Sequence, residues 1–424
     1  MPKIIKLKDG ALLLYHKNTQ SKATAFRVGM LRGGYLDKNT GLSHLFEHML
    51  FKGTTNWSNE ELTALIRDNF SNLNASTSGD YMIIRSYESK KKIKQAFKIS
   101  SDMLLNSTFD KEELEKEKQV VRQEIIRAND DIQRIASHNL NIMAYNYPEL
   151  KSKTLGDEKK MMAITQKQML KHREDNLVRE NFIASVCSNL PACVIKKYIN
   201  EYFVNHLKSG KKNTFDSCNF TINGKSGMVV ETMDRQKVVM KVAIPCNGYL
   251  DMKKSFLLSR VLSYTSGVKG PLFDHFREKK QLVYSIALRR NTNKHDGLLF
   301  FDIETSTDKV NECFYAIKDF MDEVKQGIAQ KDVARLLEKY EENDDRFVGH
   351  PVDFCSGLMF DYLDYGRIVK DKEFKRLKKF ITKENLDATI LEVFNPDKIF
   401  ISVAGPVNKK DIMPLSKIEK LIIG

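Results

Sequence analysis

Hydrophobic and polar residues alternate along this chain in two periods, and these predict strands and helices. The first fifteen residues read as strand, Asp-Gly turn and strand. The apolar residues of 41–53 fall on one helical face, with Gly53 as the expected stop. Residues 110–127 predict a second helix because they are rich in strong helix formers, and the second half of 73–87 predicts a strand.

The same patterns return later in the chain at low similarity. The strand and helix of 80–97 align with 296–314, and the helix and strand of 165–186 align with 382–403. The offset is about 217 residues, which predicts two similar α/β halves.

A polar stretch at 209–220 separates these halves and has the composition of a linker. We therefore expect a first domain at 1–208 and a second domain at 221–424. A chain of 424 residues is long enough for two domains with substantial cores.

The helix at 41–53 carries the most informative chemistry, the pattern H-x-x-E-H at residues 44–48. Positions i and i+4 lie one turn apart on one helix face, so His44 and His48 can share one zinc ion. Glu47 can reach the open coordination position, and the pattern is the inverted form of the H-E-x-x-H zinc hydrolase motif. The alternative is a core helix whose histidines are only hydrogen-bonded or solvated.

A zinc hydrolase needs a third protein ligand, and the helix at 110–127 offers candidates. Glu117 and Glu124 lie two turns apart along one face, whereas most other charges there are expected on a solvated surface. Valine and isoleucine flank Glu124 on both sides. We therefore expect its carboxylate to point inward, where it needs a partner such as a metal.

These segments resemble the zinc helix and third-ligand helix of the pitrilysin–insulinase family of inverted zinc peptidases. The resemblance is to its mitochondrial processing peptidase branch, in a short two-domain form. It implies that His44, His48 and Glu124 bind one zinc ion per chain. It also implies that Glu47 takes a proton from the metal-bound water and passes it to the leaving amine, while Glu117 orients a ligand or the water.

Residues 270–285 resemble the Arg/Tyr segment in the second domain of that family, with Arg277 and Tyr284 at its two functional positions. A guanidinium and a phenol can donate hydrogen bonds to a peptide carbonyl or to the oxyanion that forms on it. Taken alone, this segment could also be an ordinary amphipathic helix that runs into a strand.

Asn74-Ala75 resembles a family dipeptide on an edge strand that pairs with extended substrate, and we expect Ser76 to take part. Such pairing captures a peptide through main-chain hydrogen bonds. The chain departs from the family just upstream, where residues 70–73 stand in place of a frequent glycine pair.

The resemblance implies an α+β fold with two structurally similar halves, each a mixed or antiparallel sheet packed with helices, forming a clamshell around a chamber. The implied function is a zinc endopeptidase or oligopeptidase for peptides or unfolded segments. One chain carries both the zinc set and the Arg/Tyr pair, so no specialised partner subunit is expected. The chain is about half as long as the four-domain members of the family, and we therefore expect a homodimer. The alternative is a non-catalytic scaffold subunit on the same fold, although a scaffold has no use for Glu47.

The composition and net charge exclude few classes of function. The net charge is +14 and the pI about 9.2, but the lysines are spread along the chain, so a solvated surface is the preferred interpretation. A basic chamber that favours acidic peptides is a weaker alternative. A nucleic-acid-binding protein with an accidental H-x-x-E-H is a third hypothesis, but no nucleic-acid-binding motif is present and we expect no such partner.

The mean hydropathy is −0.42, and no apolar run is long enough to span a bilayer, so we expect no membrane partner. The chain shows no signal-peptide or transit-peptide pattern, which favours the cytoplasm unless a presequence has been removed. The six cysteines are scattered without a C-x-x-C pair, and we expect reduced thiols.

Overall fold

The computed structural model describes residues 2–70, 72–213, 221–266, 270–346 and 350–424. The chain forms two compact units, and each takes one segment from the other half of the sequence. The first unit is Met1–Arg127, Glu149–Ser217 and Phe347–Val369; the second is Ala128–Pro148, Cys218–Arg346 and Lys370–Gly424. The predicted linker at 209–220 lies largely outside the described residues, and the domain boundaries stay a prediction.

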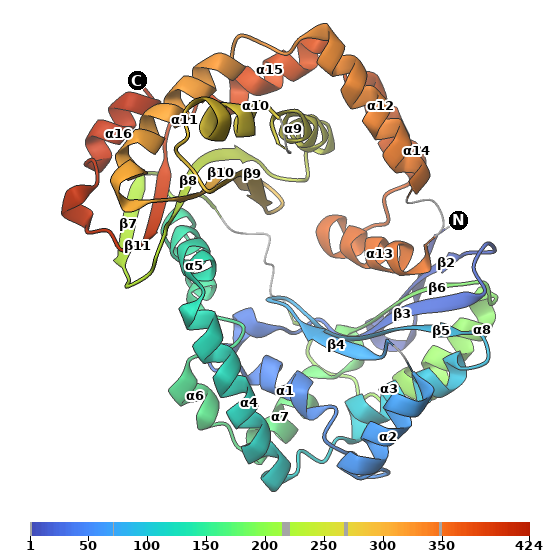
Figure 1. Cartoon of the computed structure of the whole chain (residues 1–424). Helices are drawn as coiled ribbons and strands as arrows, with labels where there is room; N and C mark the ends of the chain where they lie inside the picture. The colour runs from blue at the N-terminus through green and yellow to red at the C-terminus, as the bar shows by residue number, and fades with distance from the viewer. Residues whose placement is uncertain (1, 71, 214–220, 267–269, 347–349) are drawn as a thin grey trace. The chain divides into compact units, whose positions relative to one another are not determined.

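The first unit is built on a six-stranded sheet with the order β1-β2-β6-β3-β5-β4 (Figure 1). Its strands are β1 (Lys3–Lys6), β2 (Leu12–Lys17), β3 (Ala23–Met30), β4 (Asn74–Thr77), β5 (Met82–Ser89) and β6 (Phe182–Ser188). Strands β2 and β6 are parallel, and the other pairs are antiparallel. The predicted strand, turn and strand at the start of the chain are confirmed as β1, a turn and β2.

The second unit has a five-stranded sheet with the order β7-β11-β8-β10-β9. Its strands are β7 (Gly227–Thr232), β8 (Val238–Asn247), β9 (Ser285–Thr292), β10 (Asp296–Thr305) and β11 (Phe400–Gly405). They take the places of β2, β3, β4, β5 and β6, again with one parallel pair, β7 with β11. The predicted pair of similar halves is therefore confirmed.

Helices cover both faces of the first sheet. They are α1 (Leu42–Met49), α2 (Asn59–Asn69), α3 (Ile93–Asn106), α4 (Lys111–Asp130), α6 (Glu158–Met162), α7 (Gln166–Asn176), α8 (Ala192–Ile199) and α13 (Pro351–Tyr365). The main core lies between the sheet and the N-terminal helices, with Phe46, Phe97 and Phe203 fully buried. On the opposite face, α13 packs on β2, β3 and β6 (Figure 1).

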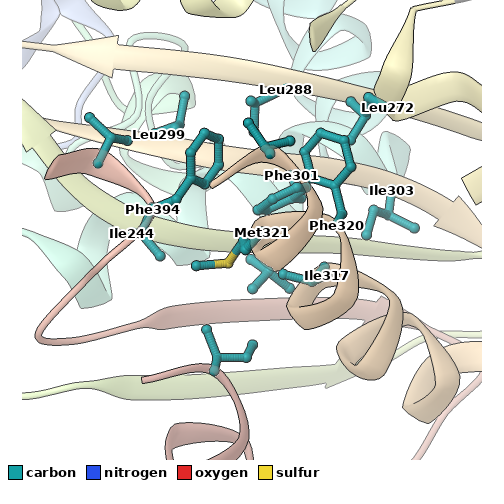
Figure 2. Packing of buried hydrophobic residues seen from close by; sticks show 14 of the residues in the cluster. Ile244, Leu272, Leu288, Leu299, Phe301, Ile303, Ile317, Phe320, Met321 and Phe394 are labelled. Atoms are coloured by element: carbon teal, nitrogen blue, oxygen red, sulfur yellow. The ribbon is translucent and has the colours of Figure 1, made fainter. Parts of the chain in front are cut away.

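The second unit repeats this arrangement. Its helices are α5 (Ile132–Ala144), α9 (Met252–Thr265), α10 (Pro271–Phe273), α11 (Val310–Val324), α12 (Gln330–Arg346), α14 (Asp371–Leu377), α15 (Lys383–Val393) and α16 (Leu415–Ile422). Figure 2 shows its core, where the rings of Phe301 and Phe320 lie 6.0 Å apart and perpendicular. Helix α5 packs on β7, β8 and β11, as α13 does on the first sheet.

None of the helices in the described ranges is both long enough and apolar enough to cross a bilayer. The five described cysteines are free thiols, and Cys218 lies outside the described residues.

Candidate metal centre

Helix α1 presents His44 and His48 side by side, with ring centroids 4.6 Å apart. Leu45, Phe46 and Met49 are fully buried on the other side of the helix, which fixes the direction of both imidazoles. The helix ends at Met49, earlier than the predicted stop, and Gly53 adopts a φ of +102° in the turn that follows.

The start of α1 is held by a carboxylate that lies outside the helix. Asp37 accepts hydrogen bonds from the backbone N–H and the hydroxyl of Ser43, at 2.6 and 2.9 Å. It also pairs with Arg32 at 3.0 Å, and both side chains are nearly buried. Burial raises the pKa of Asp37, opposed by Arg32 and Ser43. This cap fixes the first turn, directly before His44.

Glu124 of α4 completes a three-residue cluster with the two histidines. Its Oε2 lies 3.6 Å from His44 Nε2 and 3.8 Å from His48 Nε2. One donor atom from each residue lies within 4.8 Å of the others. Two imidazole nitrogens and one carboxylate oxygen form the donor set of a catalytic zinc site that keeps an open position, so these residues fit the metal.

The Glu124 carboxylate faces His44 and His48, but its apolar flank is only partly buried. Val120 and Ile126 are 48 and 39 % exposed, and the Glu124 side chain is 38 % exposed. The helical period places Val121 and Ile125 in the core and turns Val120 and Ile126 to solvent. Glu124 stands at the boundary, where solvent can reach the cluster.

Glu117 lies behind the cluster and orients His48. Its Oε1 is 2.8 Å from His48 Nδ1, and its Oε2 is 2.7 Å from Lys52 Nζ. An Nδ1–H that donates to Glu117 leaves Nε2 available as a metal ligand. Burial alone would raise the pKa of Glu117, but the hydrogen bonds from His48 and Lys52 outweigh it and lower the pKa.

Glu47 lies between the two histidines in sequence, and Thr77 at the end of β4 hydrogen-bonds to its carboxyl group. Burial raises the pKa of Glu47, opposed by Thr77 and His48. The hydroxyl of Thr77 also lies 3.3 Å from the carbonyl oxygen of Ser43. The predicted site residues on this strand end at Ser76 and do not include Thr77. Lys52, one helical turn beyond His48, was not predicted either.

Strand β4 is an edge strand, as predicted for Asn74 and Ala75. Asn74 is exposed, Ala75 is buried, and Ser76 is half-buried. Thr77 at the end of β4 contacts both Glu47 and α1, so this edge strand ends beside the cluster. Binding of substrate by Asn74, Ala75 and Ser76 stays a prediction.

Arg277 and Tyr284 lie together in the second unit, at the surface. Arg277 belongs to a π-helical turn at Asp274–Lys279, a distortion often found at functional sites. Its guanidinium donates to the carbonyl oxygen of Tyr284 and lies 5.5 Å from the ring centre of Phe273. Tyr284 is 56 % exposed just before the edge strand β9.

Comparison with known proteins places these features in a family. The model "Insulinase (Peptidase family M16)" matches residues 20–158, and "Peptidase M16 inactive domain" matches residues 163–340. An uncharacterized zinc protease of Rickettsia felis is 23 % identical over 343 residues, which are 80 % of this chain and 82 % of that protein.

One further relative and one solved structure are similar to this chain and point to the same family. The human mitochondrial-processing peptidase subunit beta is 30 % identical over 134 residues, 32 % of this chain and 27 % of that one. The structure of a protease from Helicobacter pylori shares the fold with a TM-score of 0.83 at 16 % identity, covering 96 % of this chain and 99 % of that one. The chain belongs to the insulinase family of peptidases, M16.

Proposed function

We propose that the chain is a zinc-dependent metallopeptidase that hydrolyses peptides or unfolded segments in an enclosed chamber. The observation that carries the proposal is the cluster of His44, His48 and Glu124 with Glu47 beside it. The zinc protease names of several relatives support the same class of enzyme.

The residues of the cluster have separate roles in this proposal. A zinc ion held by His44, His48 and Glu124 would supply a Lewis acid and make a water molecule more acidic. The Glu47 carboxylate takes a proton from the attacking water and delivers it to the leaving amine. Glu117 holds His48 in one tautomer, and Thr77 holds the Glu47 carboxyl in place.

The substrate would bind as an added strand on β4, through main-chain hydrogen bonds at Asn74, Ala75 and Ser76. Arg277 and Tyr284 would donate hydrogen bonds to a carbonyl oxygen of the peptide. We extend the proposal to one zinc ion per chain and to a homodimer of identical chains, in which no second type of subunit is required because each chain holds both sets of residues.

The second candidate is a scaffold subunit on the same fold. It is favoured by the description of the matched second model as an inactive domain. That match covers residues 163–340 and so does not include the metal cluster. The intact Glu47 favours the peptidase.

Metal content and peptide cleavage test the proposal together. We expect about one zinc per chain, with loss of zinc in a His48→Ala and Glu124→Ala double variant. Cleavage of a peptide library should stop with a chelator and return with added zinc. Zinc-loaded protein that cleaves no peptide in the library would favour the scaffold instead.

A further inference from the structure

Two arginines stand opposite each other on the first sheet, beside the edge strand. Arg27 of β3 is the direct neighbour of Arg85 of β5, and Arg85 is the direct neighbour of Asn74 of β4. Like charges in directly opposite positions of a sheet repel each other. Such a pair needs water or a negative charge nearby. The surroundings of the two guanidinium groups therefore show whether the protein itself supplies that charge.

The two arginines line a cavity of about 510 Å³. Tyr87 and His350 form part of its wall. Arg27 donates a hydrogen bond to the hydroxyl of Ser356 on α13, at 2.6 Å. Within the described ranges, neither Arg27 nor Arg85 makes an ion pair with a carboxylate of this chain.

The second unit provides an internal comparison at the matching positions. Lys241 of β8 is the direct neighbour of Asp302 of β10, just as Arg27 is of Arg85. The strands correspond, and Arg27 and Lys241 each have a serine as their neighbour on the opposite side.

In the second unit the positive charge is neutralised inside the protein. Lys241 Nζ lies 2.7 Å from Asp302 Oδ1 and 2.9 Å from Gln133 Oε1, and its side chain is 3 % exposed. In the first unit an arginine stands where the second has the aspartate. Lys241 therefore has a carboxylate partner, which it shares with Arg289 at 3.0 Å from Asp302, whereas Arg27 stands beside a second positive charge, and the two arginines line a cavity.

We propose that Arg27 and Arg85 bind a carboxylate of the bound peptide, from an acidic side chain or from its C-terminus. The inference rests on the proposed function for the position of the peptide along β4. Thr77 touches Glu47 at one end of β4, and Asn74 is the neighbour of Arg85 at the other. Three residues of strand span roughly 10 Å, so the carboxylate lies about three residues from the cleaved bond.

Binding of uncleaved peptides tests the inference directly. Fluorescence anisotropy would compare a labelled neutral peptide with versions that carry Glu or Lys at successive positions, each with a free or an amidated C-terminus. The protein is the whole chain of 424 residues with Glu47→Gln. We expect one Glu position, or the free C-terminus, to tighten binding by about tenfold at low salt.

The variant Arg85→Asp introduces the residue type found in the second unit. It should abolish the preference for a carboxylate and give tighter binding of a Lys peptide. Arg67→Asp changes the net charge equally at a 71 % exposed position of α2 outside the cavity, and it should keep the preference. Arg85→Gln, with thermal unfolding as a check, separates loss of charge from loss of folding.

The inference is overturned if neither a Glu position nor the free C-terminus tightens binding relative to the neutral amidated peptide, or if the preference survives Arg85→Asp and Arg85→Gln. Cleavage is measured separately. A carboxylate preference without cleavage of any peptide would contradict the proposed function alone. Zinc-dependent cleavage without that preference would contradict this inference alone.

Discussion

The hydrogen bond between Glu117 and His48 allows a quantitative prediction for zinc binding. In Glu117→Ala the Nδ1–H of His48 loses its acceptor at 2.8 Å, in a place where the two side chains are only 8 and 17 % exposed. A hydrogen bond to a charged group contributes about 1.5–3 kcal/mol. Its loss should therefore raise the dissociation constant for zinc by about 10- to 100-fold.

Competition with a chromophoric chelator at fixed pH measures this change. Glu117→Gln keeps an acceptor but not the charge, so its zinc affinity should fall between those of the wild type and Glu117→Ala. Glu112→Ala is the matched control, because Glu112 is an exposed carboxylate in the first turn of the same helix. Equal zinc affinity in Glu117→Ala and Glu112→Ala would refute the assigned role of Glu117.

Three other predictions concern the start of α1, a buried histidine and the Arg/Tyr pair. Asp37→Ala leaves Arg32 buried without its carboxylate and removes the cap on Ser43. The free energy of unfolding, measured in urea, should therefore fall by about 3–5 kcal/mol, and a decrease below about 1 kcal/mol would contradict this role. Burial lowers the pKa of His172 to about 3 from its usual 6.5, so the unfolded chain takes up a proton below pH 6.5 and the folded chain does not. Stability should therefore fall as the pH drops below 6.5, by about 2 kcal/mol at pH 5, and His172→Phe should remove that slope. Arg277→Ala should lower kcat/KM by about 100-fold without changing zinc content or stability, because Arg277 is exposed; an unchanged kcat/KM would exclude it from catalysis.

Local patterns predicted His44, Glu47 and His48 and the helices that carry the cluster, whereas the choice of Glu124 as the third ligand also rested on the resemblance to a family. The spacing of His44, Glu47 and His48 fixes their common helix face, and the seven-residue interval places Glu117 and Glu124 on one side of α4. The strand periods and the internal repeat predicted two similar sheets. These features depend on neighbours within two helical turns or on similarity between segments, and both are visible in a single sequence.

The remaining features depend on which segments meet in space. The residue before α1 is a glycine with positive φ, which has no side chain to cap the helix, so the sequence contains no capping motif that would predict the role of Asp37. Arg27 and Arg85 are 58 positions apart and become neighbours only through the order and register of β3 and β5. Glu124 is only half-buried because Val120 and Ile126, unlike Val121 and Ile125, lie on the side of α4 that faces solvent.

In the proposed function, the cluster and Glu47 together hydrolyse peptides. The most direct measurement compares the cleavage of quenched peptides by the wild type and by Glu47→Gln, both loaded with zinc and matched for metal content. We predict that Glu47→Gln keeps about one zinc per chain and loses cleavage by at least about 100-fold, because the proposed mechanism assigns removal of the proton from water to the Glu47 carboxylate. Equal cleavage by the two proteins at equal zinc content would contradict the claim.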